Sequence, residues 1–254
     1  MGGDVAAIVP AAGASQRFGG RTAKPFVLLN GQPLLVHTLL TLQQSPVIRW
    51  ILLVVRSADR ARVAALVKQY RLTKVCGLST GGASRAESVM RGFHALPKAA
   101  QWVLVHDGAR PCVAPQLISA SVHAAKRYGA VACGLPSTLT VKAVDDGGEV
   151  RLTLDREHLW FVQTPQVFRR DWFAQAIGRA NGQLAQFPDD AALLEAAGFH
   201  VRMIPGDPLN LKVTTRDDLL LADAILKRRA QRSEDRHQRS EQKVKWSARA
   251  SALV

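Results

Sequence analysis

The residues that can do chemistry in this chain begin in a loop after its first apolar segment. The apolar run ends at Pro10, small residues follow, and Arg17 and Lys24 come next. Proline cannot donate a strand hydrogen bond, and Gly13 lets a ligand approach the backbone closely. Backbone N–H groups of such a loop can bind an oxyanion, and the two cations add positive charge. The sequence therefore predicts a polyphosphate site whose loop residues are Pro10, Ala11, Ala12, Gly13, Ala14 and Ser15.

An ordinary strand-to-helix turn with solvated Arg and Lys side chains is the alternative for this loop taken alone. The segment matches neither the Walker A pattern nor G-x-G-x-x-G, the two commonest nucleotide-binding fingerprints. The longer string, P-A-A-G-x-S-x-R-F followed by Lys24-Pro25-Phe26, resembles the N-terminal signature of nucleotidyltransferases that activate sugar phosphates and polyol phosphates.

Two more polar loops follow predicted strands. Gly81–Arg85 comes after a short strand at 74–76. Asp107–Pro111 comes after the apolar strand 102–106, whose last residue, His106, we expect to pack at the strand end rather than act as a base. The carboxyl ends of parallel strands share one edge of a sheet, and ligands bind there. We therefore expect all three loops to form a single site.

Alternating strands and helices with short connections predict the scaffold that positions these loops. We expect strands at 6–9, 50–55, 74–76, 102–106, 130–135, 160–168 and 201–204, and helices at 33–42, 58–70, 86–96, 115–128, 191–197 and 215–228. Asp189 and Asp190 precede one of these helices, and we interpret them first as an N-cap and dipole pair, with a catalytic role as the alternative. The order predicts an α/β fold with a doubly wound, mostly parallel, Rossmann-like sheet.

A β-hairpin interrupts this alternation. The stretches 140–144 and 149–155 alternate apolar and polar residues around an Asp-Gly turn. An isolated two-stranded ribbon is only marginally stable in water. We therefore expect an arm at about 136–160 that projects from the domain and packs against a second subunit.

Length and charge limit the domain organisation. The formal net charge is +14, and nucleic-acid binding is one explanation for it. The segment from Lys227 onward holds nine Lys or Arg against three acids, which leaves about +8 that anionic substrates can explain. We expect one domain at 1–228, followed by a basic tail at 229–254 that lacks apolar periodicity and stays disordered.

The three cysteines and the hydropathy pattern indicate the compartment. Cys76, Cys112 and Cys133 are far apart and form no C-x-x-C pair, so we expect buried free thiols in a reducing compartment rather than disulfides or a zinc site. No apolar run approaches the length of a membrane span, and no targeting pattern precedes the first strand. These features favour a cytoplasmic protein.

Taken together, the motifs resemble those of the 2-C-methyl-D-erythritol 4-phosphate cytidylyltransferases, a family of the non-mevalonate isoprenoid pathway. The matching strings are PAAGASQRF with Lys24, GGASRAESV, WVLVHDGARP, Thr140 with Lys142, LDR at 154–156, QTPQ at 163–166 and NLKVT at 210–214. They span roughly residues 5–227. The glycine loop alone would also fit guanylyltransferases or other cytidylyltransferases, but the later strings in this order are specific. The chain departs from the family pattern at Pro25 and at Leu139, where an acid is common.

The resemblance implies a reaction and a set of site residues. A phosphate oxygen of methylerythritol phosphate attacks the α-phosphorus of CTP and expels pyrophosphate. Arg17 and Lys24 are the expected catalytic residues, which stabilise charge on the α-phosphate. Gly81, Gly82, Ala83, Arg85 and Ser88 are expected to bind the nucleotide, although Ser88 has first-turn helix capping as an equal alternative.

The acceptor site is also inferred from the resemblance. Its expected residues are Asp107, Arg110, Thr140, Arg156, Thr164 and Lys212. Asp107 is in addition the expected ligand of Mg²⁺, because that ion typically binds one or two carboxylates together with substrate phosphates. If the arm crosses to a partner, Arg156 completes the neighbouring site, and the active enzyme is a homodimer.

Two other functions stay open at the level of sequence. The nearer one is a cytidylyltransferase for another polyol phosphate, such as ribitol 5-phosphate. The other is a nucleic-acid-binding module, which the net charge alone suggests. That module would bind tightly and salt-sensitively even without the tail, but no aromatic-basic interleaving in the core supports it.

Overall fold

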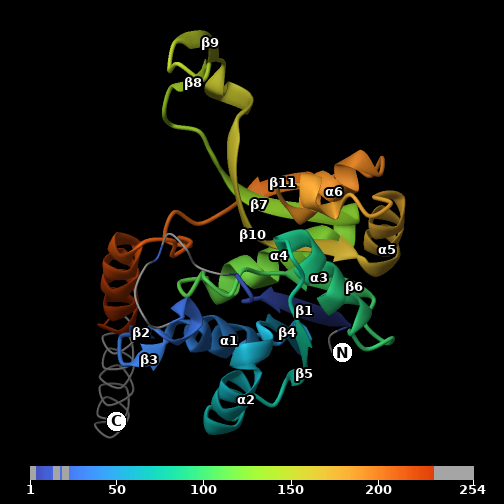
Figure 1. The fold of residues 1–254 in the computed structure, drawn as a ribbon, viewed down its shortest axis with the longest axis vertical. Coiled ribbons are helices and arrows are strands. Elements are labelled where there is room, and N and C mark those ends of the chain that lie inside the picture. The colour runs from blue at the N-terminus through green and yellow to red at the C-terminus, as the bar shows by residue number, and fades with distance from the viewer. Residues whose placement is uncertain (1–3, 14–17, 19–22, 232–254) are drawn as a thin grey trace, which may run out of the picture.

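A seven-stranded sheet forms the centre of the molecule in this computed structural model, which describes residues 4–13, 18 and 23–231 (Figure 1). The strand order is β11 (Arg202–Pro205), β7 (Ala130–Pro136), β10 (Trp160–Arg169), β6 (Trp102–Val105), β1 (Val5–Pro10), β4 (Ile48–Val55) and β5 (Val75–Thr80). Neighbouring strands run parallel except where β10 lies antiparallel to β6 and β7. The predicted mostly parallel, doubly wound sheet is confirmed.

Helices cover both faces of this sheet, which explains why its central strands are almost continuously apolar. On one face pack α1 (Leu34–Gln44), α2 (Arg60–Gln69) and α4 (Pro115–Tyr128), with Leu39, Val63 and Ile118 in the shared core. On the other pack α3 (Arg85–His94), α5 (Arg170–Arg179) and α6 (Asp190–Ala196), with Phe93, Phe173 and Leu194.

A smaller third layer lies beside the sheet. A helix at 216–231 packs through Ala222 against Leu29 and Leu34, near the short strands β2 (Leu28–Leu29) and β3 (Gln32–Pro33). The helix extends beyond its predicted end at 228 into the first residues of the predicted tail. The rest of that tail, 232–254, lies outside the described residues.

Several predicted boundaries need correction. The strand predicted at 74–76 extends to Thr80, and neither α5 nor the β2–β3 pair was predicted. Short 3₁₀ helices lie at Lys24–Phe26, Ser57–Asp59, Arg156–His158 and Leu184–Gln186. Cys112 and Cys133 are buried and free as expected, but Cys76 is exposed because β5 is an edge strand. Within the described ranges, no helix is long and apolar enough to cross a membrane.

The predicted hairpin is present as β8 (Val141–Val144) and β9 (Val150–Leu154), paired antiparallel. It projects far from the body of the molecule between the end of β7 and the start of β10 (Figure 1). The arm and its root expose seven large apolar side chains: Leu139, Val144, Val150, Leu152, Trp160, Phe161 and Val162. A projecting ribbon with this much exposed apolar surface has the character of an interface.

Candidate functional site

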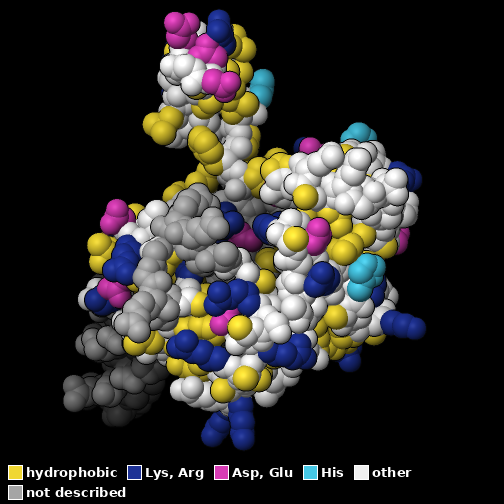
Figure 2. Space-filling view, in the orientation of Figure 1, with side chains coloured by type: hydrophobic (Ala, Val, Ile, Leu, Met, Phe, Trp, Pro, Cys, Tyr) yellow, Lys and Arg dark blue, Asp and Glu magenta, His cyan; other side chains and the backbone are white. Residues whose placement is uncertain are grey.

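A cleft of about 650 Å³ opens at the edge of the sheet where the three predicted loops meet. The predicted site residues that line it are Pro10, Ala11, Ala12, Gly13, Lys24, Gly82, Ala83, Arg85, Ser88, Asp107 and Lys212. Lining residues that sequence reasoning missed are Pro25, Leu34, Ser84, Gly108, Ala109 and Thr214. The carboxyl-edge rule therefore located the cleft correctly. Lys and Arg side chains are also numerous on the molecular face drawn in Figure 2.

The first loop leaves the sheet at the end of β1. The Ala11 N–H donates to the carbonyl of Val54 at 2.7 Å, which keeps the loop against β4. Gly81 brings the second loop close, because a Cβ there would lie 2.3 Å from the Cβ of Ala12. Only glycine permits this approach. Ala14, Ser15 and Arg17, which we predicted in the same loop, lie outside the described residues.

The second loop is held by side chains at the start of α3. The Gly82 N–H donates to Ser88 Oγ at 3.0 Å, and Ser88 Oγ donates to the Ser84 carbonyl at 2.9 Å. Ser84 is the N-cap, since its hydroxyl accepts from the Glu87 N–H at 3.1 Å. The capping role considered for Ser88 therefore belongs to Ser84, and Ser88 ties the glycine loop to the helix.

Lys24 approaches the cleft from the far end of the first loop. Its Nζ donates to the carbonyl of Val213 at 3.1 Å. Lys24 is the first residue of a 3₁₀ turn that continues through Pro25 and Phe26, and Ala23 before it is in extended conformation. The contact joins the N-terminal loop to the 210–214 segment, although the two are far apart in the sequence.

Asp107 is the electrostatic centre of the cleft. Its Oδ1 accepts from Arg85 Nε at 3.1 Å, and its Oδ2 lies 2.8 Å from Lys212 Nζ and 3.9 Å from Arg110 Nε. The side chain is buried, which disfavours the charged form, but Arg85, Lys212 and Arg110 hold the pKa of Asp107 well below its ordinary value. Asp107 is therefore ionised at neutral pH. It positions the neighbouring cations and does not act as a proton acceptor.

A second acid faces the same arginine. Arg85 Nη2 lies 2.9 Å from Asp190 Oδ2, and Asp190 is only 2% exposed. Burial opposes the charge of Arg85, yet Asp190 and Asp107 together raise its pKa above the ordinary value. Burial raises the pKa of Asp190 against the attraction of Arg85. Asp189 is the N-cap of α6, as predicted, and its carboxylate accepts from the Ala192 N–H at 2.8 Å.

A buried polar network supports the Asp107 turn from below. Thr164 Oγ1 accepts from the Asp107 N–H at 3.1 Å and lies 3.1 Å from His106 Nδ1. The side-chain amide of Asn210 donates to the backbone carbonyl of Thr164 at 2.8 Å. The backbone carbonyl of Asn210 accepts from Arg110 Nη1 at 2.7 Å. Thr164 and Arg110 thus hold the turn and the 210–214 segment, and they do not line the cleft.

His106 lies inside this network, as expected of a packing residue. It is fully buried, and burial together with the nearby Arg110 lowers its pKa to about 4. At neutral pH it is uncharged and has no access to the cleft.

Two predicted acceptor residues lie on the arm, away from the cleft. Thr140 is exposed at its root, and exposed Arg156 donates to the Thr138 carbonyl at 2.8 Å. Neither lines the cleft of its own chain. A contribution from either residue would have to reach the cleft of another copy.

Asp107 is also the relevant residue for a divalent cation. Among the described residues, no three His, Cys, Asp or Glu side chains gather as a metal site. One ionised carboxylate bordering the cleft fits Mg²⁺, because that ion takes one or two carboxylates and fills its shell with phosphate oxygens and water.

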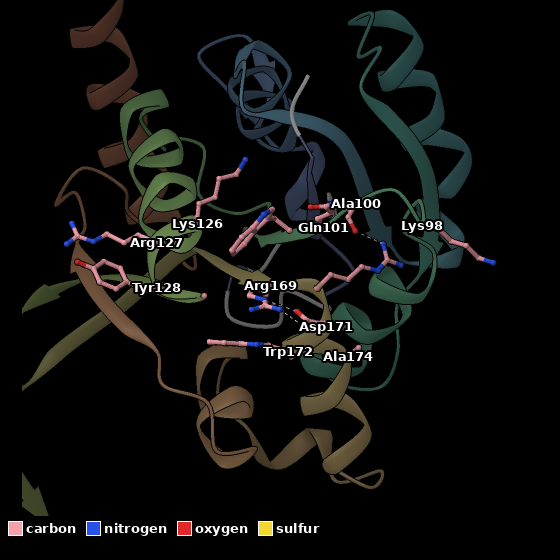
Figure 3. A pocket seen from close by; sticks show the side chains of 13 residues that line it. Lys98, Ala100, Gln101, Lys126, Arg127, Tyr128, Arg169, Asp171, Trp172 and Ala174 are labelled. Atoms are coloured by element: carbon pink, nitrogen blue, oxygen red, sulfur yellow. Dashed lines mark hydrogen bonds and ion pairs between the residues drawn. The ribbon is translucent and has the colours of Figure 1, made fainter. Parts of the chain in front are cut away.

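A larger hollow of about 820 Å³ lies at the opposite edge of the sheet (Figure 3). Its charges pair locally: Arg169 binds Asp171 at 2.6 Å, and Arg170 donates to the carbonyls of Pro97 and Ala100. None of the predicted site residues lines it. Size alone therefore does not identify the functional site, whereas the convergence of reactive side chains does.

Comparison with known proteins agrees with this arrangement. Residues 5–228 match the family model of 2-C-methyl-D-erythritol 4-phosphate cytidylyltransferase. Proteins of that name from Syntrophus aciditrophicus and Dehalococcoides mccartyi are 43% and 42% identical, and each alignment covers 88% of this chain and 96% of the relative. The crystal structure of 4-diphosphocytidyl-2C-methyl-D-erythritol synthase from Anaerococcus prevotii superposes with a TM-score of 0.77 at 28% identity, covering 89% of this chain and 100% of that one.

Proposed function

The chain belongs to the 2-C-methyl-D-erythritol 4-phosphate cytidylyltransferase family, and from that premise we propose how its residues divide the reaction. The enzyme transfers a cytidylyl group from CTP to 2-C-methyl-D-erythritol 4-phosphate and releases pyrophosphate, in isoprenoid precursor biosynthesis. The observation that carries the assignment of roles is one cleft that Lys24 lines and in which Arg85 and Lys212 pair with the ionised Asp107.

The chemistry requires charge neutralisation more than proton transfer. Both substrates are phosphate anions, and the attacking phosphate oxygen is already ionised near neutral pH. Preorganised donors in a cleft can lower the barrier by stabilising charge that develops on the α-phosphate. A buried neutral His106 and an Asp107 with depressed pKa suit this mechanism, because neither has to accept a proton.

Lys24 and Arg17 are proposed to stabilise the α-phosphate. The position of Lys24 at the cleft wall supports its role; the role of Arg17 rests on the sequence motif alone. The loop backbone at 10–15 and the segment Gly81–Ser88 are proposed to bind CTP. Ser88 contributes by holding Gly82 in place, and Arg85 contributes charge.

The acceptor is proposed to bind on the other side of Asp107. Lys212 lines the cleft there and can meet the acceptor phosphate. Arg110 and Thr164 are proposed to act on this side as well, and their bonds to Asn210 and Asp107 suggest that they do so by fixing the turn. Asp107 would hold Mg²⁺ together with phosphate oxygens, and the ion would supply further charge neutralisation.

The remaining acceptor residues, Thr140 and Arg156, are proposed to come from a second subunit. The exposed apolar side chains of the arm and the distance of Arg156 from its own cleft support a homodimer with exchanged arms. A soluble dimer acting on phosphorylated metabolites is consistent with a cytoplasmic enzyme, which is our proposal for its location.

The test is pyrophosphate release from CTP with a panel of polyol phosphates, in the wild type and in Lys24→Ala. We expect turnover with 2-C-methyl-D-erythritol 4-phosphate to exceed that with ribitol 5-phosphate. Loss of one preorganised donor should lower turnover by about 10²–10³-fold. Lys98→Ala, in the hollow at the opposite sheet edge, is the matched control and should keep wild-type activity. Equal rates for Lys24→Ala and Lys98→Ala would contradict the role given to Lys24.

A further inference from the structure

Arg85 is held between two acids from distant parts of the chain. Its Nε faces Asp107 Oδ1 at 3.1 Å, and its Nη2 faces Asp190 Oδ2 at 2.9 Å. The two carboxylates therefore bind the Nε–Nη2 edge of the guanidinium, and Nη1 is not among the atoms they contact. Because the guanidinium group is planar, two contacts at Nε and Nη2 also fix the direction in which Nη1 points.

The two acids are not equivalent. Asp107 also pairs with Lys212 and lies near Arg110, and it borders the cleft. In the described part of the chain, Asp190 has Arg85 as its ion-pair partner and does not border the cleft. When substrates or a cation engage Asp107, Asp190 is the acid that stays available to Arg85.

Asp190 is itself placed rigidly. It opens α6 next to the N-cap Asp189, whose Oδ2 accepts from Gln166 Nε2 at 2.9 Å. Gln166 Oε1 in turn accepts from the Ala191 N–H at 3.0 Å, so one side chain of β10 binds both sides of Asp190. The start of α6 is thereby fixed to the central sheet. An arginine side chain loses considerable rotamer entropy when a ligand immobilises it. Because Asp190 is itself fixed, its ion pair immobilises Arg85 before the ligand binds, which reduces that entropy cost on binding.

We propose that Asp190 is a positioning residue for the nucleotide: through its ion pair with Arg85 it holds the guanidinium in the orientation that binds CTP. This inference rests on the proposed assignment of Arg85 to the nucleotide. Asp190 does not line the cleft, so its effect on the reaction would pass through Arg85.

The experiment compares Asp190→Asn with Asp171→Asn, which breaks an ion pair with Arg169 away from the cleft, in pyrophosphate release together with calorimetric titration of CTP without acceptor. Asn is isosteric with Asp and removes the charge that faces Arg85. We expect Asp190→Asn to raise the KM and the Kd for CTP about tenfold, because Arg85 loses the buried ion pair that orients it. The KM for the polyol phosphate should stay unchanged. Asp171→Asn removes a comparable charge at the opposite edge of the sheet and should leave both constants within about twofold.

Two further variants separate positioning from mere stability. In an Arg85→Gln background, adding Asp190→Asn should raise the KM for CTP no further, because the coupling partner is gone. Asp190→Glu keeps the charge but moves it by one methylene, and it serves if Asp190→Asn does not fold; it should also raise the KM for CTP. An unchanged KM, equal effects of the Asp171 and Asp190 substitutions, or full additivity with Arg85→Gln would overturn the proposal. Absence of turnover with CTP in the wild type would instead overturn the proposed function.

Discussion

At the scale of single residues, the site works by arranging full charges around one buried carboxylate. Asp107 contacts three cations, and each comes from a different segment: Arg85 from α3, Arg110 from its own turn and Lys212 from the 210–214 segment. Pairing within the protein offsets the desolvation cost of these partly buried charges and keeps the cations in place until anionic substrates arrive. In the proposed assignment of roles, the same residue lies where the nucleotide side and the acceptor side of the cleft meet.

Sequence reasoning identified most of these side chains because their types are informative at loop positions. Asp107 and Arg110 follow a clear strand, and Lys212 lies in a recognisable string. It assigned Asp190 first to helix capping, with a catalytic role as the alternative, and did not find its partner Arg85, which is 105 positions away in the chain. Contacts of that sequence separation leave no local pattern.

Gly81 offers a test at this scale. A Cβ at this position would meet the Cβ of Ala12 at 2.3 Å and Ser88 Oγ at 3.1 Å, so the two nucleotide-binding loops would have to separate. We expect Gly81→Ala to lower kcat/KM for CTP at least tenfold, about 1.4 kcal/mol. Gly178→Ala is the control, because no atom lies within 4 Å of the added carbon there. Steady-state kinetics of both variants decides, and wild-type kinetics in Gly81→Ala would show that the close approach is unnecessary.

At the scale of elements, periodicity predicted the helices whose buried faces are regular. The bounds of α4 were predicted correctly, and α1, α2 and α3 were displaced by a few residues. The helix α5 was missed because only Phe173 and Ala176 of its ten residues are buried, which leaves too short an apolar pattern. The arm was predicted from turn chemistry, since an Asp-Gly turn between alternating stretches is a strong local signal.

The helix at 216–231 depends on a reciprocal cap at its start. Asp218 Oδ2 accepts from the Thr214 and Thr215 N–H groups at 2.7 and 2.8 Å, and the Asp218 N–H donates to Thr215 Oγ1 at 3.2 Å. Burial opposes ionisation of Asp218, but the hydrogen bonds from Thr214 and Thr215 together outweigh it and lower the pKa of Asp218 to about 2.

The sign of the resulting pH dependence follows from this depressed pKa. The stabilisation is fully present above the ordinary carboxyl pKa of about 4 and is lost as pH falls toward 2. Asp218→Asn should therefore lower the free energy of unfolding by about 0.5–1 kcal/mol at neutral pH. The difference from wild type should shrink below pH 4. Urea unfolding across this range measures it, with Asp217→Asn as the neighbouring control. A difference that stays constant down to pH 2 would exclude the cap as its source.

At the scale of the whole molecule, the cleft of one chain has its nucleotide side but lacks part of its proposed acceptor side. Thr140 and Arg156 lie on the arm, which projects away from the body (Figure 1). The exposed apolar side chains around them, such as Leu152 and Phe161, are 56% and 54% exposed. A two-fold dimer would cover these side chains and complete two sites at once.

Arm exchange can be tested by disrupting the interface. Leu152→Asp with Phe161→Asp places charges in the proposed contact and should convert the dimer to monomers with at least a hundredfold loss of turnover. Analytical ultracentrifugation and pyrophosphate release measure the two effects. Tyr128→Asp, a similarly exposed site on the body, is the control. Monomers with full activity would rule out a contribution from the partner.

Mixing inactive variants tests the same proposal without destabilising the dimer. Lys24→Ala damages its own cleft and keeps its arm, whereas Arg156→Ala does the reverse. Randomly exchanged dimers of the two should regain about a quarter of wild-type turnover, because half are mixed and each mixed dimer has one intact site. Activity that stays at the level of the separate variants would place Arg156 in the cleft of its own chain.

The course of β10 has a consequence for how the enzyme could be inhibited. This strand starts at the root of the arm. Thr164 in its middle accepts a hydrogen bond from the Asp107 turn, and Gln166, two residues later, donates one to Asp189. A displacement of the arm root would therefore reach the turn of Asp107 through Thr164 and the start of α6, which carries Asp190, through Gln166. A small molecule bound at the arm root would therefore slow turnover without occupying the nucleotide pocket.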